Sequence, residues 1–590
     1  MRRIDDLLKS ARKLSQEKNF SGSLSLYRRI LEVNPRHGDA LLAAGVMSIE
    51  LGKEAIARSY FRRAAASAPS DYRAWQNLAQ LDFQQSSLDT ALGHANKSVL
   101  AAPENPEAYH ALISILLALG RSQEALRHAK RVYRMRPNNC NLLLQVASLK
   151  RQVCDWDSFD EDDGRIRDFV AQGIRVPPLA LMATQATNAE QHACALLWAR
   201  DFEKEVSQQL PLRRSEPGKR VKVGYLSGDF HDHATSRLVA ELFEAHDRSS
   251  VEVFGYSYGP NHQSDMRTRV LRSFDHFRDL RDTSSKAAAQ LIYTDQIDIL
   301  VDMKGYTSRA RTEILSWRPA PIQVNYLGFP GTMGASFIDY VITDPVVSPP
   351  EYEAHSTERF AYLPNCFQPN DTLRPQPDGS VTRNHYGVSD NVFVFCCFNA
   401  AYKFAPHVFD RWMRILHAVP RSILCLLVRS EEQGNNLRSE ACRRGIDPAR
   451  LLLAPPAKPQ EHLARCGLAD LFLDTLPVSA FTTASDALWA GLPVLTCAGD
   501  TPAGRGSASL LTAMGLPELV TQNLDEYEQR AIDLAQSPDR LRILRDRIRL
   551  SRNTSPPFAT ALLARDLERL YIRLVADESQ RHGGKRKQVA

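Results

Sequence analysis

The chain has 590 residues, of which 43% are hydrophobic and 24% are charged, and its 74 basic and 68 acidic side chains give a net charge of +6. This length exceeds what a single hydrophobic core serves, so several folding units are expected. The small net charge, with no basic stripe and no aromatic-interleaved patch, argues against binding to nucleic acid or to a membrane surface.

The ten cysteines are scattered and form no C-x-x-C pair. This spacing argues against a disulfide framework or structural zinc, and it favours a reducing compartment. The first residues are charged and lack the apolar core of a secretory signal. No run of 18 apolar residues is long enough to span a membrane. The sequence therefore predicts a soluble, cytoplasmic protein of several domains.

Prolines recur every 34 residues in the first quarter of the chain. Small residues keep the same interval, and the four series are Pro35, Pro69, Pro103 and Pro137; Ala40, Ala74 and Ala108; Gly52, Ser86 and Gly120; and Ser23, Ala57, Ala91 and Ala125. A helix pair closed by a proline, with small residues where the helices cross, is typical of the tetratricopeptide repeat. One such pair cannot bury its own apolar face, so four are expected to stack and to present a concave groove to extended peptides. An apolar helix at 138–153 would cap the array.

Two aspartates one residue apart, Asp155 and Asp157, follow the repeats, and the acidic run 160–163 comes next. An Asp-x-Asp pair can hold a divalent metal for a sugar nucleotide. Here no strand precedes it and the segment is polar, so a solvated helix start or loop is the favoured interpretation, with metal binding as the alternative.

From residue 220 onward, short apolar runs rich in β-branched residues alternate with helical stretches. The runs begin at residues 221, 251, 297, 322 and 340, and again at 392, 423, 451, 471 and 494, with helices expected at 264–274, 285–293 and 308–317 in the first series. This alternation predicts two parallel, doubly wound sheets in tandem, joined by a linker around Pro364, Pro369, Pro375 and Pro377. The C-terminal edges of the two sheets would then face one cleft, where ligands of open α/β sheets bind.

The glycine motifs that mark two other nucleotide chemistries are missing. Neither half contains G-x-G-x-x-G, and the segment from Gly499 to Gly506 resembles a Walker A loop but lacks its Lys-Ser/Thr. Hydride transfer and ATP hydrolysis therefore lose their best support.

In the second half, candidate residues follow the ends of the expected strands. A helix at 482–490 opens with Thr482 and Thr483, and a helix start with hydroxyl groups suits a diphosphate. Simple N-capping by threonine is the alternative. Lys403, beyond the strand at 392–398, could neutralise a phosphate leaving group without a metal. His462 and Arg465, one helical turn apart, could face the cleft or lie on a polar surface.

In the first half, the stretch from Asp229 to His233 follows the first expected strand. A histidine at this edge could accept a proton from an acceptor hydroxyl, because its pKa lies near neutrality. A metal site made from two histidines and two aspartates of this stretch is the alternative.

Several longer strings resemble the catalytic halves of protein O-linked N-acetylglucosaminyltransferases. They are VGYLSGDFHDHATS (223–236), RPAPIQ (318–323) and LGFPGT (327–332) in the first half, and NAAYK (399–403), the helix around His462 and TTASDALWAG (482–491) in the second. The similarity runs from the repeats to about residue 575 and includes CDW (154–156). The plant Spindly fucosyltransferases share this architecture.

The resemblance implies a tetratricopeptide solenoid followed by two Rossmann-like α/β domains of the GT-B type. It implies an inverting, metal-independent transfer of N-acetylglucosamine from UDP-N-acetylglucosamine to Ser or Thr hydroxyls of proteins held in the repeat groove. No metal and no cofactor are expected, since the sugar nucleotide is a substrate. The expected boundaries are 1–153 for the repeats and cap, 154–218 for a helical linker, 219–378 and 379–577 for the catalytic halves, and 578–590 for a solvated basic tail.

Matching positions also imply roles for individual residues. His233 would be the base or a close contact of the reacting sugar, and Asp229 a proton relay. Leu327 and Gly328 would line the sugar pocket.

The resemblance also assigns the donor-binding residues. Lys403 would hold the diphosphate, with Thr482 and Thr483 at the helix start, and Asn399 would lie at the donor. Asp486 would hold the ribose, while Ala457, His462 and Arg465 would surround the uridine.

Three positions depart from the pattern of this family. Phe481 stands where members usually have histidine, Ala400 where animal members have glutamine, and Arg237 where they have a second histidine; the large insert of animal enzymes between the halves is also missing. These departures leave open a transferase of the same fold that uses UDP-glucose or GDP-fucose, or an Asn acceptor. A repeat scaffold that binds nucleotide with weak catalysis is the alternative of another class.

Overall fold

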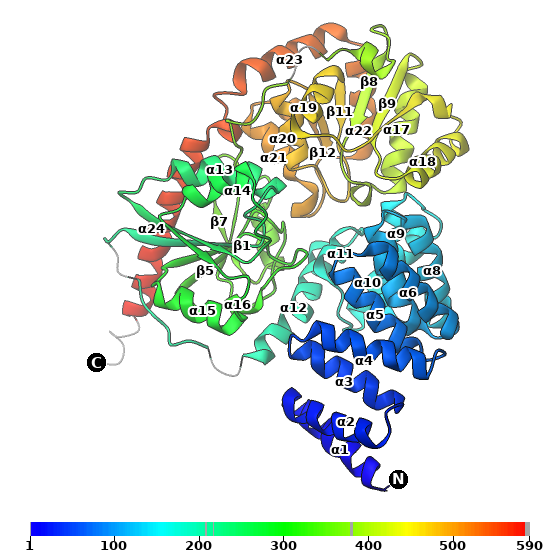
Figure 1. Ribbon diagram of the computed structural model, residues 1–590. Coiled ribbons are helices and arrows are strands. Elements are labelled where there is room, and N and C mark those ends of the chain that lie inside the picture. The colour runs from blue at the N-terminus through cyan, green and yellow to red at the C-terminus, as the bar shows by residue number, and fades with distance from the viewer. Residues whose placement is uncertain (1, 207–208, 216–217, 378–380, 585–590) are drawn as a thin grey trace. The chain divides into compact units, whose positions relative to one another are not determined.

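The computed structural model describes residues 2–206, 209–215, 218–377 and 381–584. The chain divides into two compact units, Met1–Asp155 and Trp156–Ala590. The first unit is helical, and the second contains two parallel sheets covered by helices (Figure 1).

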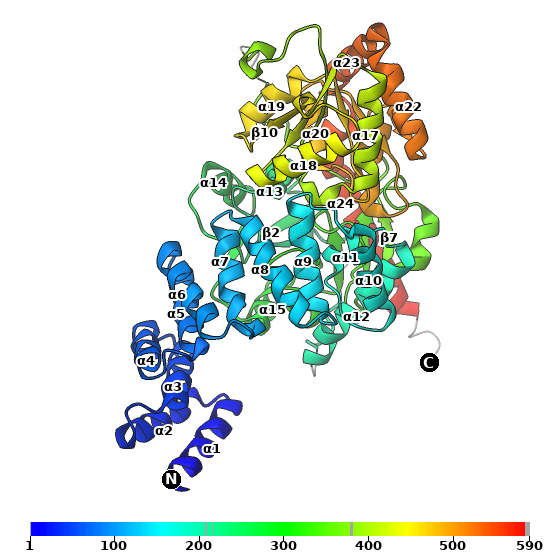
Figure 2. The same cartoon turned by 90° about the vertical axis from the view of Figure 1, so that its right-hand side faces the viewer.

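The first unit consists of antiparallel helix pairs that follow one another along the chain (Figure 2). The pairs are α1 (Arg2–Gln16) with α2 (Phe20–Val33), α3 (Gly38–Glu50) with α4 (Glu54–Ser67), α5 (Tyr72–Gln84) with α6 (Leu88–Ala101), and α7 (His110–Ala118), preceded by the 3₁₀ turn η1 (Pro106–Tyr109), with α8 (Ser122–Met135); α9 (Cys140–Gln152) follows. Each repeated proline lies two residues beyond the second helix of a pair. This arrangement confirms the predicted tetratricopeptide repeats.

The 34-residue interval is visible both in burial and in the backbone. The small residues of one series, Ser23, Ala57, Ala91 and Ala125, are each 0% exposed, because larger side chains there would separate the crossing helices. One residue with positive φ follows each of the helices α1, α3, α5, α7 and α9, and these residues are Lys18, Gly52, Ser86, Gly120 and Cys154. A left-handed residue ends a helix by turning its last carbonyl groups toward new donors. The interval therefore extends to Lys18 and Cys154, where the sequence carries no small-residue signal.

The first sheet has seven parallel strands in the order β3-β2-β1-β4-β5-β6-β7. They are β1 (Val221–Ser227), β2 (Val251–Ser257), β3 (His276–Asp279), β4 (Ile299–Asp302), β5 (Ile322–Tyr326), β6 (Tyr340–Thr343) and β7 (Arg359–Tyr362). The predicted doubly wound sheet is confirmed. β3 and β7 were not predicted, since these edge strands have four residues each and are only partly buried.

Helices α13 (Ala234–Ala245), α14 (Asp265–Arg272) and α15 (Ser285–Thr294) connect the strands of this sheet. The helix predicted at 308–317 is wrong in length, since only one turn forms, α16 (Glu313–Ser316). Arg309 and Arg318 have positive φ, and a right-handed helix cannot pass through such residues.

The second sheet has six parallel strands in the order β10-β9-β8-β11-β12-β13. They are β8 (Phe393–Cys397), β9 (Ser422–Leu427), β10 (Leu451–Ala454), β11 (Leu471–Leu473), β12 (Val494–Cys497) and β13 (Val520–Thr521). Its helices are α17 (Pro406–Ala418), α18 (Glu431–Arg443), α19 (Pro459–Leu468), α20 (Thr482–Trp489), α21 (Gly506–Ala513), α22 (Leu524–Ala535) and α23 (Pro538–Ser551).

Two helices from distant parts of the chain complete the core of the first catalytic half. The last helix, α24 (Thr560–Gly584), packs against β1 and α13, with Leu567 and Tyr571 in that core (Figure 1, red). The helix α12 (Asn188–Glu205) contributes Ala195 and Ala199, while α10 (Phe159–Ala171) and α11 (Pro178–Met182) precede it. Chain order alone assigned α24 to the second half and α12 to a linker, whereas their apolar faces belong to the first half.

The segment that joins the two halves, 363–377, is packed between them. Gln368 and Asn370 are buried; the Gln368 amide donates to Ser485 Oγ at 2.5 Å, and the Asn370 amide donates to the Pro557 carbonyl at 2.9 Å. The proline-marked linker is therefore a fixed part of the interface between the halves. The predicted boundary at 378–379 falls on residues outside the described ranges.

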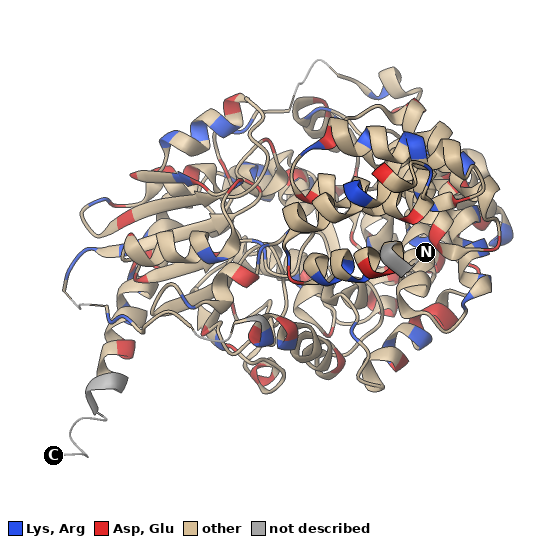
Figure 3. Cartoon of the chain, turned by 60° about the horizontal axis from the view of Figure 1, so that its bottom comes forward, with Lys and Arg blue, Asp and Glu red and all other residues tan. Residues whose placement is uncertain are grey.

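Basic and acidic residues alternate along the ribbon of the described residues (Figure 3). α24 extends to Gly584, beyond the predicted end near 577. The basic residues Lys585, Arg586 and Lys587 of the predicted tail lie outside the described residues. Among the helices that are described, none is both long and apolar enough to cross a membrane.

Candidate active site

The strand order of each sheet reverses at one point, between β1 and β4 in the first sheet and between β8 and β11 in the second. In open α/β sheets, the loops after the strands diverge at this point and leave room for a ligand. Five of the twelve candidate residues follow strands at this point: Asp229 and His233 follow β1, Asn399 and Lys403 follow β8, and Thr482 follows β11.

A cleft of about 800 Å³ is lined by both catalytic halves. Four of the predicted donor-binding residues line it: Ala457, His462, Thr482 and Asp486. From the other half, the start of α13 contributes Asp232 and Arg237. The predicted cleft between the edges of the two sheets is therefore present in the structure.

The end of this cleft where the sequence predicts the nucleotide contains Asp486 on α20. Its Oδ1 accepts a hydrogen bond from Arg374 at 2.7 Å, and its Oδ2 lies 3.7 Å from His462 Nε2. Burial lowers the pKa of His462, with Asp486 opposing that shift. His462 Nδ1 in turn accepts from Arg465 at 3.2 Å. Because Nδ1 accepts from Arg465, the proton of the neutral imidazole is on Nε2, which lies 3.7 Å from both Asp486 Oδ2 and Cys466 Sγ.

Arg465 points away from the cleft. Its guanidinium donates to the Pro455 carbonyl at 2.8 Å and lies 4.4 Å from the centre of the Phe398 ring. It therefore touches the predicted uridine region through His462, without lining the cleft itself.

Arg374 was missed by sequence reasoning. It lies on the connecting segment, and besides Asp486 it donates to Asn370 Oδ1 at 2.7 Å and to the Asp371 carbonyl at 2.9 Å. No motif marks this residue, and only the packing of the segment against α20 brings it to the site.

The diphosphate candidates surround the start of α20. The N-cap residue is Phe481, which makes no side-chain cap bond. Thr482 and Thr483 are the first two helical residues, so neither acts as the N-cap and the simple capping interpretation does not apply. A helix start of this kind leaves backbone N–H groups and hydroxyls for an anion.

Lys403 lies in the 3₁₀ turn η4 (Ala401–Lys403) after β8. Its Nζ donates to the Ser479 carbonyl at 3.0 Å and lies 5.7 Å from the centre of the Phe481 ring. Burial lowers the pKa of Lys403, and the nearby Asp474 opposes that shift. An ammonium group with a single carbonyl partner, next to the helix start, is suited to bind phosphate oxygens.

Asn399 makes its hydrogen bonds to other side chains of the protein. It is buried, and its amide donates to Thr475 Oγ1 at 2.8 Å and to Asp474 Oδ1 at 3.3 Å. Asp474 also accepts from the Ala480 N–H at 2.8 Å and from Thr496 Oγ1 at 2.7 Å. This network fixes the loop between β11 and α20, so the predicted donor residue Asn399 supports the loop that leads to α20.

In the first half, at the point where the strand order reverses, Asp229 is paired with Lys304. Lys304 Nζ donates to both carboxylate oxygens at 3.0 Å, and the side chains are 9% and 12% exposed. Lys304 was not among the predicted site residues. Its only signal in the sequence is its position just beyond an apolar run, which becomes the strand β4 beside β1.

His233 is the N-cap of α13. Its Nδ1 accepts from the Thr235 N–H at 3.2 Å and lies 3.6 Å from Asp229 Oδ2. Burial lowers the pKa of His233, Asp229 opposes this, and Lys304 adds to it. The imidazole is therefore neutral at pH 7.

Leu327 and Gly328 follow β5 and approach the loop that carries Lys304. Leu327 has a φ of 74°, and a Cβ at Gly328 would lie 2.1 Å from the Met303 carbonyl oxygen. Only glycine allows this approach. The predicted sugar contacts are thereby placed at the same sheet edge as Asp229, although they do not line the 800 Å³ cleft.

The alternative metal sites have no counterpart among the described residues, where no group of three His, Cys, Asp or Glu side chains is arranged to hold a metal ion. Asp155 accepts a hydrogen bond from Lys130 at 2.6 Å. The acidic run 160–163 forms the first turn of α10, as predicted for a helix start.

Comparison with known proteins identifies the fold of this site. The profile of glycosyl transferase family 41 matches residues 178–376 and 372–567, which is more than half of the chain. The chain belongs to glycosyl transferase family 41. The tetratricopeptide repeat profile matches residues 8–72, 49–106 and 77–139.

Relatives of this family 41 chain occur in plants and animals. It is 38% identical to a protein named probable UDP-N-acetylglucosamine–peptide N-acetylglucosaminyltransferase SEC of Arabidopsis thaliana, over 62% of this chain and 38% of that protein. It is 30% identical to the UDP-N-acetylglucosamine–peptide N-acetylglucosaminyltransferase of Caenorhabditis elegans, over 71% and 47%. The chain thus spans less than half of the length of these two relatives.

A solved structure, a mutant O-GlcNAc transferase of Thermobaculum terrenum, matches the family 41 chain with a TM-score of 0.69 and 27% identity, over 92% of this chain and 98% of that one. This match supports the GT-B arrangement of two Rossmann-like halves after helical repeats.

The family 41 chain departs from its expected pattern at Phe481, and the structure gives that ring a specific environment. It meets the edge of Phe367 at 6.1 Å between ring centres, and a Cβ at Gly506 would lie 2.6 Å from it. Phe481 and Leu327 both pack at the margin of the first-half core. An apolar ring therefore stands beside Lys403, where a polar donor is usual. Arg237, a second departure, is ion-paired with Asp232 at 2.8 Å.

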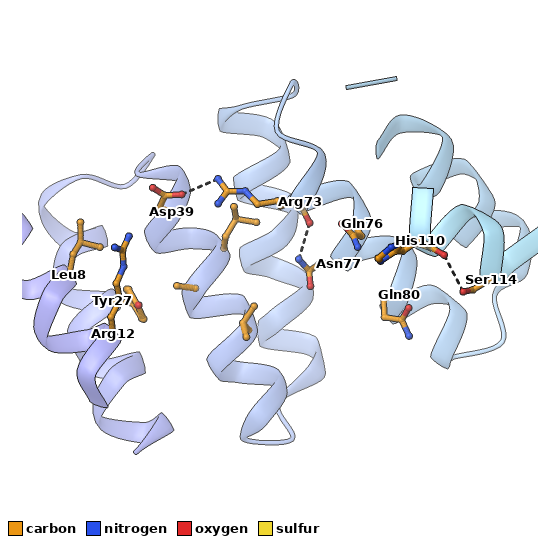
Figure 4. A pocket seen from close by; sticks show the side chains of 14 residues that line it. Leu8, Arg12, Tyr27, Asp39, Arg73, Gln76, Asn77, Gln80, His110 and Ser114 are labelled. Atoms are coloured by element: carbon orange, nitrogen blue, oxygen red, sulfur yellow. Dashed lines mark hydrogen bonds and ion pairs between the residues drawn. The ribbon is translucent and has the colours of Figure 1, made fainter. Parts of the chain in front are cut away.

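The repeat unit carries a second cavity, a groove of about 510 Å³ lined mainly by the first helices of the pairs. Figure 4 shows Arg73 paired with Asp39, while Gln76, Gln80 and His110 lie farther along it. Arg12 and Tyr27 lie toward its other end. Amide, guanidinium and hydroxyl groups along one groove are suited to the backbone and side chains of an extended peptide.

Proposed function

We propose that this protein is an O-N-acetylglucosaminyltransferase that transfers N-acetylglucosamine from UDP-N-acetylglucosamine to Ser or Thr hydroxyls of proteins. The transfer would be inverting and independent of metal. The observation that carries the proposal is the cleft between the two sheet edges, which is lined by Thr482 and Asp486 from one half and by Asp232 and Arg237 from the other. His233 adjoins Asp232 in the chain, and its Nδ1 lies 3.6 Å from Asp229 Oδ2. Family membership and the names of the relatives support it.

On the donor side, Lys403 and the start of α20 would bind the diphosphate and stabilise the negative charge that develops on the leaving UDP. Asp486 would hold the ribose through Oδ2, because Oδ1 is occupied by Arg374. Ala457 and His462 would contact the uridine, with Arg465 behind His462. Leu327 and Gly328 would line the sugar pocket.

On the acceptor side, His233 and Asp229 would handle the proton of the attacking hydroxyl. With Nδ1 accepting from Thr235, a neutral His233 carries its proton on Nε2. In this state it donates a hydrogen bond to a reacting group, and it becomes a base only when the Nδ1 contact is released. Both oxygens of Asp229 accept from Lys304, so a proton from the hydroxyl would reach Asp229 through water or through the imidazole.

The repeat groove would select acceptor proteins, since its polar lining suits an extended segment. A cytoplasmic location belongs to the same proposal and rests on the scattered cysteine spacing.

A second candidate is the same transfer from another donor, UDP-glucose or GDP-fucose, or to an Asn acceptor. Phe481 favours it, because an aromatic ring beside Lys403 replaces a hydrogen-bond donor. The two candidates share the fold and the leaving-group chemistry, and they differ in the sugar.

The test is nucleotide release by the purified chain in EDTA, with UDP-N-acetylglucosamine, UDP-glucose, UDP-galactose or GDP-fucose offered separately. Preferential release from UDP-N-acetylglucosamine is expected, and Phe481→His should raise that preference further. Preferential release from another donor would replace the first candidate by the second. No release with any donor, with or without a protein acceptor, while UDP still binds, would leave a nucleotide-binding scaffold.

A further inference from the structure

The pair of Lys304 and Asp229 crosses the point where the first sheet reverses. Asp229 follows β1 and Lys304 follows β4, and these strands are direct neighbours. Both oxygens of Asp229 are engaged by one ammonium group at 3.0 Å. Since the two side chains are largely buried, the pair is screened little by water and holds the carboxylate in one orientation.

The second carboxylate near Lys304 is not a competing partner. Asp302 accepts from the backbone N–H groups of Lys304 at 2.9 Å and of Gly305 at 3.1 Å. Burial raises the pKa of Asp302 to about 6. Within the described part of the chain, the Lys304 ammonium donates hydrogen bonds to the Asp229 carboxylate, whereas Asp302 accepts from the backbone that presents this lysine.

The nearest imidazole, His233, is left without a bond to this carboxylate. Its Nδ1 lies 3.6 Å from Asp229 Oδ2, too far for a hydrogen bond, and it accepts instead from the Thr235 N–H at 3.2 Å. A ring nitrogen that accepts a backbone N–H carries no proton. The proton of the neutral ring is then on Nε2.

We propose that Lys304 is a positioning residue that withholds Asp229 from His233 and thereby keeps the imidazole in its neutral, Nε2-protonated form. Lys304 acts through its bond to Asp229 and through its charge near His233, and it need not touch substrate. The inference deepens the proposed function, because it concerns the acceptor side of the same site. The state of the ring is measurable in the protein without donor or acceptor.

The physical reason is a competition for one buried carboxylate. Without the ammonium, Asp229 would be a buried charge with no cationic partner, which is strongly unfavourable. The titratable and charged groups that face His233 are Asp229, Lys304, His231 and Arg237; Asp229 raises the imidazole pKa, and burial and the other three lower it. When Lys304 is removed, one of the charges that lower the His233 pKa disappears, and Asp229 becomes free to accept from a protonated Nδ1. The imidazole pKa then rises and the tautomer changes.

The experiment uses the full chain with ¹⁵N-labelled histidine, and the His233 signal is assigned by its loss in His233→Gln. In wild type we expect an Nε2-protonated neutral ring. In Lys304→Met the neutral ring should carry its proton on Nδ1, and its titration should move to higher pH. Lys304→Arg, which retains the charge, should keep the wild-type form. Lys222→Met is the matched control, because Lys222 is a lysine at the opposite end of β1, and it should change neither property.

Two further variants separate positioning from folding. Asp229→Asn removes the carboxylate and keeps Lys304. It should move the His233 titration to lower pH, because the carboxylate that would accept from a protonated Nδ1 disappears while the ammonium stays. In the double variant Asp229→Asn/Lys304→Met the Nδ1 proton should not appear. An unchanged tautomer and titration in a folded Lys304→Met protein would overturn the proposal. If Lys304→Met does not fold, the Asp229→Asn variant decides. A His233 titration that stays at the wild-type pH or moves to higher pH in this variant would overturn the proposal.

Where turnover is measurable, the acid limb of kcat/KM gives a second readout. If the neutral ring is required, activity is lost as pH falls through the imidazole pKa. A raised pKa therefore moves this loss of activity to higher pH. We expect the ratio of kcat/KM at pH 6 to that at pH 8 to fall by roughly tenfold in Lys304→Met. A protein that shows the tautomer change but no transfer would reject the proposed function and retain the role of Lys304.

Discussion

The ion pair between Arg374 and Asp486 gives a prediction that does not depend on any catalytic role. Arg374 is 11% exposed in its side chain and Asp486 25%. The guanidinium has three hydrogen-bond acceptors, Asp486 Oδ1, Asn370 Oδ1 and the Asp371 carbonyl, and it lies 5.2 Å from the centre of the Trp489 ring. Arg374→Met keeps most of the side-chain volume but removes every one of these bonds.

The magnitude follows from what the substitution leaves behind. Removing one partner of a buried ion pair destabilises by about 3–5 kcal/mol, because the remaining charge is uncompensated. Asp486 is a quarter exposed, and His462 lies nearby, so the lower end applies, about 3 kcal/mol. For a folding unit the size of one catalytic half, this free energy corresponds to a decrease in melting temperature of roughly 6–12 °C.

The assay is thermal and urea unfolding, followed by tryptophan fluorescence, of Arg374→Met, Asp486→Asn and the double variant. The double variant should be more stable than the sum of the single effects predicts, with a coupling of about 1–3 kcal/mol. Arg540→Met, on the exposed surface of α23, is the control and should change stability by about 0.5 kcal/mol or less. Strictly additive losses would refute the reasoning, because they would show that the pair contributes nothing and that other contacts hold the connecting segment.

Three further predictions concern single positions. Lys403→Met should lower kcat by roughly 10²–10³-fold with a smaller loss of UDP affinity, measured by steady-state UDP release and calorimetry, because the charge matters most for the leaving group; a change below threefold would contradict its role. Gly328→Ala should lower both melting temperature and transfer, because the new Cβ would lie 2.1 Å from the Met303 carbonyl, whereas Gly467→Ala, a helical position with nothing within 4 Å, should be neutral. Arg12→Glu in the repeat groove should reduce modification of protein acceptors while UDP release without acceptor is unchanged; equal losses in both assays would show that the groove does not select acceptors.

The sequence by itself determined the repeats, the two parallel sheets and the positions of the strand ends. Repeats are visible because the 34-residue interval places Ala57, Ala91 and their equivalents at the same helix crossing. Sheets are visible because a buried strand needs a continuous apolar run, and Asp229 and Lys403 stand directly after such runs. These signals are local, so they can be read without knowing which segments meet.

Only the tertiary structure decided which charges are partners. Lys304 pairs with Asp229 across 75 residues, and Arg374 pairs with Asp486 across 112. Neither pair has a sequence signal, because an isolated lysine or arginine gains a partner only when strand order or a packed connection brings a carboxylate within reach. The apolar face of α24 likewise finds its partners only in the fold, because the helix packs in the core of the half that lies far before it in the chain. Sequence pattern selects the elements and their ends, whereas the energetic state of a buried charge depends on the neighbours that the fold supplies.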